Sequence, residues 1–301
     1  MKIKFLFFFI FFLPFEVEAC DVCGCGMGGQ YFGILPQFQR HFVGLRYIQR
    51  SFTSQHPALF SYDKPSVSND QYDRFEIWGR WAVNPRLQIF GFLPYQMSTQ
   101  VGSATQKVNG ISDPWFMVNY MVINTGDSVE HSWRHALIVG AGAKLPFGKI
   151  YTSSGESGTP TQLQPGTGSI DLPFHLGYTL RRNQIGINLE TNFRFNTKNK
   201  KDYQFGHRLN SAVRFFYWKQ WGNVSILPSA GLAYEWASTD KQKNIQVEMT
   251  GGDLWAMHLG FDFYYRSFII QSQWQPALAS HLGGGTVTPG SRFQIGTSIL
   301  F

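Results

Sequence analysis

Hydrophobic and polar residues alternate along most of this 301-residue chain, from about residue 38 to its last residue. The alternation has a period of two, which is the spacing of side chains on one face of a β-strand, and it recurs in twelve segments. In the sixth segment, Leu172 and Phe174 fall on one face, whereas Asp171 and His175 fall on the other. Because the second face is polar, these strands do not lie in a core that is dry on both sides.

The segments predict strands, and the connections between them alternate in length. We expect strands over 38–53, 72–83, 86–100, 110–123, 133–147, 168–181, 184–197, 205–218, 223–238, 252–266, 268–280 and 291–301. Short connections follow the even-numbered strands, at 84–85, 124–132, 182–183, 219–222 and 266–267. Longer loops follow the odd-numbered strands, at 54–71, 101–109, 148–167, 198–204, 239–251 and 281–290.

Short turns at one end and long loops at the other are typical of an outer-membrane barrel, whose turns are periplasmic and whose loops are extracellular. The sequence therefore predicts an all-β protein, a single up-and-down antiparallel transmembrane β-barrel of about twelve strands. The even number of strands predicts that both termini lie in the periplasm. The expected location is the outer membrane of a Gram-negative bacterium.

Aromatic residues favour a membrane barrel over a water-soluble β-sandwich, which also has alternating strands. A sandwich would keep its aromatic side chains inside, whereas a membrane barrel gathers them at its two interfaces with the headgroups. We expect such a girdle from Tyr95, Trp133, Tyr217, Trp218, Trp221, Tyr234, Trp236, Tyr264 and Tyr265. The last strand alternates and ends on Phe301, which resembles the recognition signal of bacterial outer-membrane proteins. Outer-membrane lipid and the barrel-assembly machinery are therefore expected partners.

The N-terminal region does not share the alternation. Lys2 and Lys4 precede the only long apolar run, 5–15, and small residues follow near Ala19. This order is typical of a secretory signal peptide. The expected domains are a signal peptide over 1–19, a Cys- and Gly-rich periplasmic segment over 20–37, and the barrel over 38–301.

The basic charge of the chain belongs to the mature protein. The formal net charge is +7, and removing residues 1–19 leaves it unchanged because that segment holds two lysines and two glutamates. The positive charge is spread through loops and polar strand faces, without the basic stripe that binds nucleic acid. We therefore expect no nucleic acid partner. Outside the cell, we expect the basic residues to contact lipopolysaccharide phosphates.

The polar strand faces place charged residues of both signs inside the barrel, with arginine in excess. The residues expected there are Arg40, Arg46, Arg50, Arg74, Glu76, Arg80, Asp113, Lys144, Asp171, His175, Glu190, Arg194, Arg208, Arg214, Glu235, His258, Asp262 and Arg292. One interpretation is that they pair with one another, because an ionised group in a narrow barrel needs a partner or water. The other is an arginine-lined pore that favours anionic or polar solutes. Twelve strands favour a narrow conduit over a wide one.

Three short blocks of sequence carry a resemblance to a known family. They are Gly110-Ile-Ser-Asp113, Lys144-Leu-Pro-Phe-Gly148, and Gln164-Pro-Gly-Thr-Gly-Ser169 followed by Asp171. These blocks resemble the signature of transporter-like outer-membrane barrels of the MetA-pathway phenol-degradation family. Phe147 and Lys149 depart from that pattern, which usually has a small polar residue and an acid there. The resemblance implies a transport barrel for small organic solutes.

All three cysteines lie in one glycine-rich stretch, Cys20-Asp-Val-Cys23-Gly-Cys25. This spacing can place three thiolates around one soft metal ion, Cu or Zn, with Met27 as a further ligand. Two other interpretations stay open: Cys20 is acylated as the first residue of a lipoprotein, or two cysteines form a disulfide in the oxidising periplasm. A metal site at the periplasmic mouth could exchange ions with a periplasmic partner.

We expect no enzymatic activity. A barrel lipase needs a serine and a histidine within hydrogen-bond reach, and a group that orients the histidine. His41 and His207 fall on the expected lipid face, and Ser211 follows His207, but no nucleophile motif accompanies them. No phosphate-binding glycine motif and no helical zinc-protease motif occur in the sequence.

The sequence leaves two possible functions, one in transport and one in structure or binding. One is a transporter or narrow pore for small polar, anionic or organic solutes, with a continuous wet lumen. The other is a closed structural or binding barrel, plugged by ion pairs, whose Cys-rich N-terminus binds Cu or Zn. The loop 148–167 discriminates between them, because a loop folded into the lumen narrows a channel, whereas an outward loop forms a binding surface.

The metal interpretation of the cysteines can be tested on the purified mature chain. Metal analysis by mass spectrometry should find about one bound Cu or Zn per chain, held by the thiolates. The double substitution Cys23→Ser and Cys25→Ser should abolish it, because two of the three thiolates are lost. A double variant that keeps its metal would contradict this interpretation.

Overall fold

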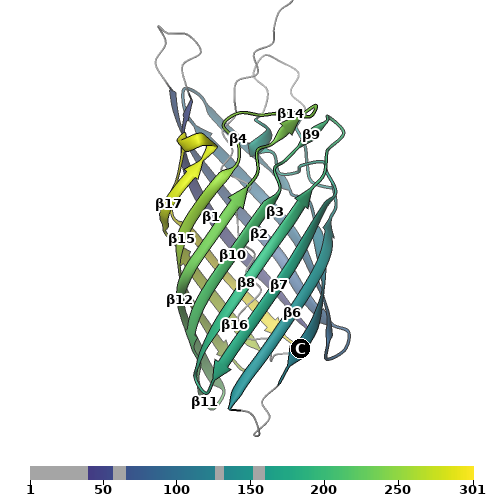
Figure 1. The fold of residues 1–301 in the computed structure, drawn as a ribbon, viewed down its shortest axis with the longest axis vertical. Helices are drawn as coiled ribbons and strands as arrows, with labels where there is room; N and C mark the ends of the chain where they lie inside the picture. Colours follow the sequence, from purple (N-terminus) through teal and green to yellow (C-terminus); the bar gives the residue numbers. More distant parts are fainter. Residues whose placement is uncertain (1–39, 57–65, 126–131, 152–159) are drawn as a thin grey trace, which may run out of the picture.

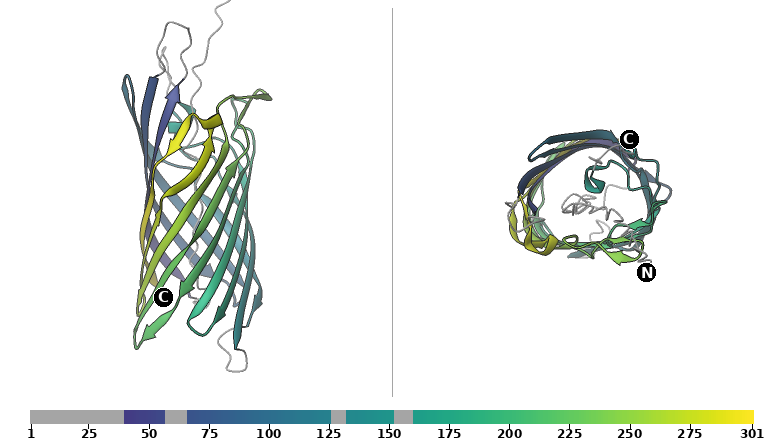
Figure 2. Two further views of the ribbon diagram at one scale, coloured as in Figure 1. Left: turned by 60° about the vertical axis from the view of Figure 1, so that its left-hand side comes forward. Right: turned by 90° about the horizontal axis from the view of Figure 1, so that it is seen from above.

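The computed structural model describes residues 40–56, 66–125, 132–151 and 160–301. Over these residues the chain forms a closed antiparallel β-barrel, with long strands tilted around one axis (Figures 1 and 2). The described wall consists of twelve spans, and pairing of the first with the last closes the ring. The predicted all-β barrel is therefore confirmed.

Each span pairs with its neighbours in chain order, and some spans are interrupted by a short break. The spans are β1 (Phe42–His56), β2 (Ser66–Ala82), β3 (Leu87–Val101), β4 with β5 (Thr105–Ile111, Trp115–Asn124), β6 (Trp133–Lys144), β7 (Asp171–Arg182), β8 (Ile185–Asn196), β10 (Arg208–Tyr217), β12 (Val224–Ala237), β15 (Gly252–Tyr265), β16 with β17 (Phe268–Gln275, Ala277–Leu282), and β18 with β19 (Val287–Pro289, Arg292–Leu300). The remaining short elements are β9 (Tyr203–Gln204), β11 (Lys219–Trp221), β13 (Lys241–Gln242), β14 (Ile245–Gln246), and the 3-10 turns η1 (Thr161–Leu163) and η2 (Gly283–Gly285).

Apolar side chains cover the outer face of the wall, as the alternation predicts. In β7, Leu172 and Phe174 are 40% and 46% exposed, whereas Asp171 is 2% exposed and His175 is also buried. The same alternation runs through β8, where the outward Leu189 is exposed and the inward Glu190 is buried. An outer face of large exposed apolar residues is solvated by lipid in a membrane barrel, with its polar groups turned inward.

The two ends of the barrel differ. Tight turns join the spans at one end, and Asn183, Gly222 and Arg266 adopt the positive φ that two-residue hairpins need. The chain terminus at Phe301 lies at this turn end (Figure 1). At the opposite, loop end, β9, β13 and β14 form a small separate sheet. Within the described residues, no helix is long and apolar enough to cross a membrane.

Several predicted boundaries are wrong at the loop end. β2 begins at Ser66, not at 72, because its added residues continue the ladder with β1 as far as His56. Most of the predicted loop 101–109 is a hairpin of β3 and β4. Polar residues occupy both faces there, so the period of two no longer marks the strand. The span expected over 110–123 is also broken, between Ile111 and Trp115.

Two further expectations need correction. The first strand begins at Phe42, so Arg40 lies outside the wall and is exposed. Trp218 and Tyr264 were expected in the outer aromatic girdle, yet both are buried and form an edge-to-face pair with ring centroids 5.5 Å apart. Their aromatic rings pack inside the barrel because the turn end of the lumen is apolar, as described below.

The expected orientation can be tested with epitope insertions in two turns of similar geometry. A tag placed between Lys243 and Asn244, in the turn of β13 and β14, should bind antibody on intact cells. A tag placed between Asn183 and Gln184 should bind only after the outer membrane is permeabilised, because the turn end is predicted to be periplasmic. The opposite labelling pattern would show that the barrel is inserted the other way.

Candidate functional site

The lumen is apolar near the turn end. A continuous cluster of buried inward side chains, here called the aromatic layer, consists of Phe42, Trp78, Phe90, Phe92, Trp115, Met117, Phe216, Trp218, Leu227, Tyr264, Ile269 and Leu300. Phe92 and Trp115 stack face to face, with ring centroids 3.6 Å apart. Met117 and Leu227 face the lumen and are almost completely buried there. This part of the lumen is therefore a dry constriction.

Buried ion pairs occupy the lumen above the aromatic layer. Glu76 is fully buried and accepts hydrogen bonds from Arg46 and, at 2.7 Å, from Arg74. The guanidinium of Arg46 also lies over the Trp78 ring, 4.6 Å from its centroid. Further ion pairs among the described residues join Lys144 to Asp113 and Asp171, Arg214 to Glu190, and Arg292 to Glu235. Pairing of this kind compensates for the cost of removing each charge from water.

Several other predicted lumen residues contact neighbouring groups inside the barrel. His175 meets the Asn192 amide oxygen at 2.9 Å, and His258 lies between Ser229 and Gln273, at 3.2 and 2.9 Å. Asp262 accepts hydrogen bonds from Tyr264 and Gln271. Arg80 donates to the carbonyl oxygen of Arg40 and lies over the Phe42 ring. The inward groups are thus largely engaged with one another.

The three family-like sequence blocks meet at one carboxylate, that of Asp113. Its Oδ1 accepts a hydrogen bond from Gly148 N at 2.8 Å. Its Oδ2 accepts hydrogen bonds from the Thr167 amide and hydroxyl, at 2.8 and 2.7 Å, and from Lys144 Nζ at 2.9 Å. Lys144 also pairs with Asp171 Oδ2 at 2.6 Å. Residues far apart in sequence are therefore fixed to one buried cluster, here called the Lys144 network.

Close backbone contact explains two glycines in those blocks. A Cβ on Gly148 would lie 2.6 Å from Gly166 Cα, and a Cβ on Gly166 would lie equally close to Gly148. Gly166 N also donates to the Lys149 carbonyl oxygen at 3.0 Å. A larger residue at either position would separate the two backbone segments and weaken the bonds to Asp113.

The described end of the loop 148–167 folds into the lumen. η1 lies inside the ring of strands, where it is the coiled segment seen within the barrel from above (Figure 2). Leu163 is 0% exposed and belongs to a cluster with Val108 of β4 and Leu254 of β15, which stand on opposite sides of the ring. The side-chain amide of Gln164 accepts a hydrogen bond from Tyr151 N and donates one to the Tyr151 carbonyl oxygen. These bonds join the two described parts of the loop. Residues 160–167 of the loop are therefore inward, and residues 152–159 lie outside the described residues.

A cavity of about 110 Å³ lies between η1 and the wall, and we call it the chamber. Among its described lining residues, five are cationic and one is acidic: Arg50, Arg74, Lys144, Arg194 and Arg208 against Asp113. Apolar and neutral polar groups complete the lining, among them Trp115, Phe205, Gln96 and Gln162. This volume accommodates several water molecules or one small solute.

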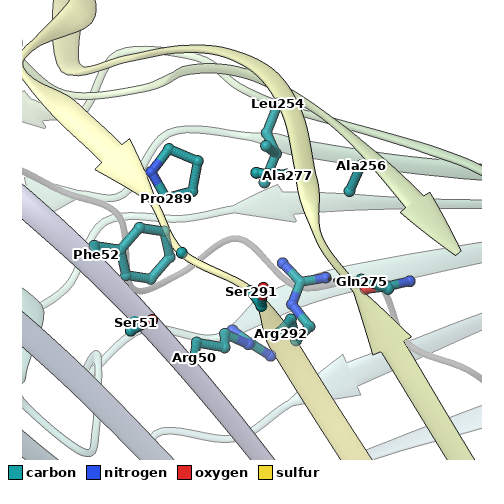
Figure 3. A pocket seen from close by; sticks show the side chains of 11 residues that line it. Arg50, Ser51, Phe52, Leu254, Ala256, Gln275, Ala277, Pro289, Ser291 and Arg292 are labelled. Atoms are coloured by element: carbon teal, nitrogen blue, oxygen red, sulfur yellow. Dashed lines mark hydrogen bonds between the residues drawn. The ribbon is translucent and has the colours of Figure 1, made fainter.

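A second, much smaller cavity of about 10 Å³ lies where β17 and β18 meet the rest of the wall (Figure 3). Arg50 and Arg292 lie on one side of it, and Phe52, Leu254 and Ala277 lie on the other (Figure 3). It has room for about one water molecule. Of the two cavities, the chamber is therefore the one large enough to hold a solute.

The residues considered for catalysis have other partners. His207 stacks on Phe195, with ring centroids 4.4 Å apart, and its Nδ1 accepts the Asn196 amide at 3.1 Å. The hydroxyl of Ser211 bonds to that of Thr191 at 3.1 Å. Within the described residues, no group of three His, Cys, Asp or Glu side chains could hold a metal ion. Cys20, Cys23 and Cys25 lie outside those residues.

Comparison with known proteins supports the fold. No protein-family model matches the chain, and no curated protein matches its sequence. An outer membrane channel from Pseudomonas putida F1 matches in structure with a TM-score of 0.66 and 13% identity, over 87% of this chain and 96% of that one. The beta domain of the Bordetella autotransporter BrkA matches with a TM-score of 0.51 and 10% identity, over 87% and 100%.

At these identities the likeness extends to the fold alone. The chain is similar in architecture to outer-membrane barrels, which supports the sequence resemblance to transporter-like barrels at that level. The function is argued from the site itself, because unrelated functions share one fold.

The aromatic layer and η1 were not predicted from the sequence. Trp78, Phe90 and Phe92 share the inward parity of Arg74 and Arg80, so the alternation contained this information. The aromatic residues expected from the sequence were instead placed on the outer face, in the girdle or at the C-terminus. The position of η1 depends on contacts between distant segments, which no local pattern of residues encodes.

Removing the central charge of the Lys144 network should destabilise the barrel. Lys144→Met leaves Asp113 and Asp171 close together without their shared cation, and breaking such a buried pair costs about 3–5 kcal/mol. We expect a lower thermal unfolding temperature, measured by the heat-dependent gel mobility of the folded barrel, and faster proteolysis of the loop 148–167. Lys241→Met is the matched control, because Lys241 is exposed. Equal stability of the two variants would contradict this role.

Proposed function

We propose that the protein is an outer-membrane channel that conducts small polar and anionic solutes through a narrow lumen. The observation that carries the proposal is the chamber, a polar cavity inside a closed barrel whose charged lining residues are mostly cationic. Cationic groups that line a pore lower the energy of an anion inside it and raise that of a cation. Small organic solutes with an acidic group fit this lining and agree with the resemblance to transporter-like barrels.

The inward loop supports a channel rather than an outward binding surface. The Lys144 network fixes the loop against the wall, with Gly148 and Thr167 both bonded to Asp113. A loop held in this way reduces the cross-section of the lumen without detaching from the barrel. We infer that it selects solutes by size, while Arg194 and Arg208 select them by charge.

The aromatic layer supplies the barrier on the turn side of the chamber. A dry apolar constriction opposes the passage of hydrated ions, because water and ions leave a narrow space lined by apolar side chains. We infer that solutes cross only when rings such as Phe92 and Trp115 move apart. The same burial favours the alternative function, a closed binding barrel, so measured currents must decide between the two.

The partners expected from the sequence remain predictions. Lipopolysaccharide phosphates are the expected partner of the exposed lysines at the loop end, including Lys198, Lys200 and Lys241. The barrel-assembly machinery is the expected partner of Phe301. The Cu or Zn site at Cys20, Cys23 and Cys25, together with a periplasmic partner, remains the prediction for the N-terminal segment.

Single-channel recordings in planar bilayers test the proposed function. The mature protein should give small ohmic steps whose reversal potential in a salt gradient shows anion preference. The double variant Phe92→Ala and Trp115→Ala should raise the conductance several-fold, because it removes two stacked rings from the constriction.

The control for this experiment is Phe116→Ala, which removes a neighbouring aromatic ring from the outer face of the same span. It should leave the conductance unchanged. If neither the wild type nor the double variant conducts at high protein load, the proposed channel function is wrong and the closed binding barrel is favoured. Cation preference would refute the charge selectivity alone.

A further inference from the structure

We propose that Arg194 and Arg208 form a saturable binding site for a small dianion within the chamber. The inference deepens the proposed channel function and rests on it, because it names the class of solute that the lumen selects. The ligand class is an oxyanion of charge −2 that is small enough for the chamber, such as sulfate, a phosphate group or a short dicarboxylate.

The fold places the two arginines side by side. Arg208 of β10 and Arg194 of β8 are direct register partners, and both line the chamber. Side chains of register partners start about 5 Å apart on the same face of the sheet, where like charges destabilise each other. The ladder therefore forces two positive charges together, which is unfavourable unless an anion lies between them.

No described carboxylate forms an ion pair or hydrogen bond with either arginine. Arg194 lies within electrostatic reach of Asp171 and Glu76, but also of two cations, Arg208 and Arg74. Asp171 is already paired with Lys144, and Glu76 is already paired with Arg46 and Arg74. The nearby negative charges are thus committed to other cations, and the arginine pair has an uncompensated positive charge.

One unused hydrogen-bond donor in the arginine pair indicates where the dianion binds. The Nε of Arg208 is buried and has no hydrogen-bond partner among the described residues. A guanidinium presents its donors in a planar fork that matches two oxygens of one anion. Two adjacent guanidinium groups can therefore bind one tetrahedral or dicarboxylate dianion with both charges compensated, whereas a monoanion compensates only one.

The rest of the lining suits a small oxyanion. Gln96, Gln162 and Thr161 supply neutral donors on the other walls of the chamber, and Arg50 adds a further positive charge. The chamber volume of about 110 Å³ limits the ligand to a small molecule. Charge-assisted hydrogen bonds are stronger near the low-dielectric protein interior than in open water, so the affinity should be measurable in solution.

Isothermal titration calorimetry on the full mature chain in detergent micelles tests the site directly. The probes are sulfate and succinate, each titrated at constant ionic strength, with chloride as the monoanion. We expect saturable binding of one dianion per chain, and at least about tenfold weaker binding of chloride, because one positive charge stays uncompensated.

The double substitution Arg194→Gln and Arg208→Gln should weaken dianion binding by about tenfold or more, since it removes both charge-assisted partners. The matched control, Arg182→Gln and Arg266→Gln, removes two exposed positive charges at the turn end and should bind as the wild type does. Folding of both variants is checked by heat-dependent gel mobility.

The outcomes separate this inference from the proposed function. Saturable binding that depends on the arginine pair supports the site whether or not the barrel conducts, and a conducting barrel without saturable binding overturns the site alone. Equal weakening by the two double variants would also overturn it, because binding would then follow overall charge. A preference for sulfate over succinate indicates a phosphate-like ligand, and the reverse indicates a dicarboxylate; either supports the dianion site.

Discussion

The buried ammonium group of Lys144 is the contact on which the interior of this barrel depends. It lies between the carboxylates of Asp113, in the break between β4 and β5, and Asp171, at the start of β7. Asp113 in turn holds the amides of Gly148 and Thr167, at the two ends of the inward loop. Without this shared cation the two carboxylates would repel each other, and the loop would lose its anchor in the lumen.

The same contact determines the charge of the chamber. Because Lys144 pairs with Asp171, and Glu76 pairs with Arg46 and Arg74, the two acids nearest to Arg194 in electrostatic terms are already paired with other cations. A local excess of positive charge therefore lies at one depth in the barrel, beside η1. Below it, the aromatic layer forms a dry barrier, so the interior combines a positively charged chamber with a constriction.

The sequence predicts the wall of this barrel well, because a strand between lipid and a polar lumen must alternate over its whole membrane-spanning length. The spans β7 and β8 follow the expected alternation residue by residue. The prediction fails where polar residues occupy both faces of the strand, as in the hairpin of β3 and β4 at the loop end. It also fails for Trp218 and Tyr264, whose rings are inward and buried.

The candidate site was only partly predictable. The inward charges follow from parity, so Lys144, Asp171 and Arg194 were expected inside the barrel. Their partners were not, because pairing depends on the register between strands and on where the loop 148–167 folds. The pairing of Arg194 with Arg208 in adjacent strands is a property of register that alternation within one strand cannot reveal.

Solute flux into proteoliposomes tests most directly whether an anion-selective path crosses this barrel. Uptake of radiolabelled sulfate through the reconstituted mature protein should exceed that of empty liposomes and should saturate with concentration. Uptake of a cation of similar size should stay near the background. Sulfate flux no greater than that of empty liposomes would contradict the account and would indicate a closed barrel.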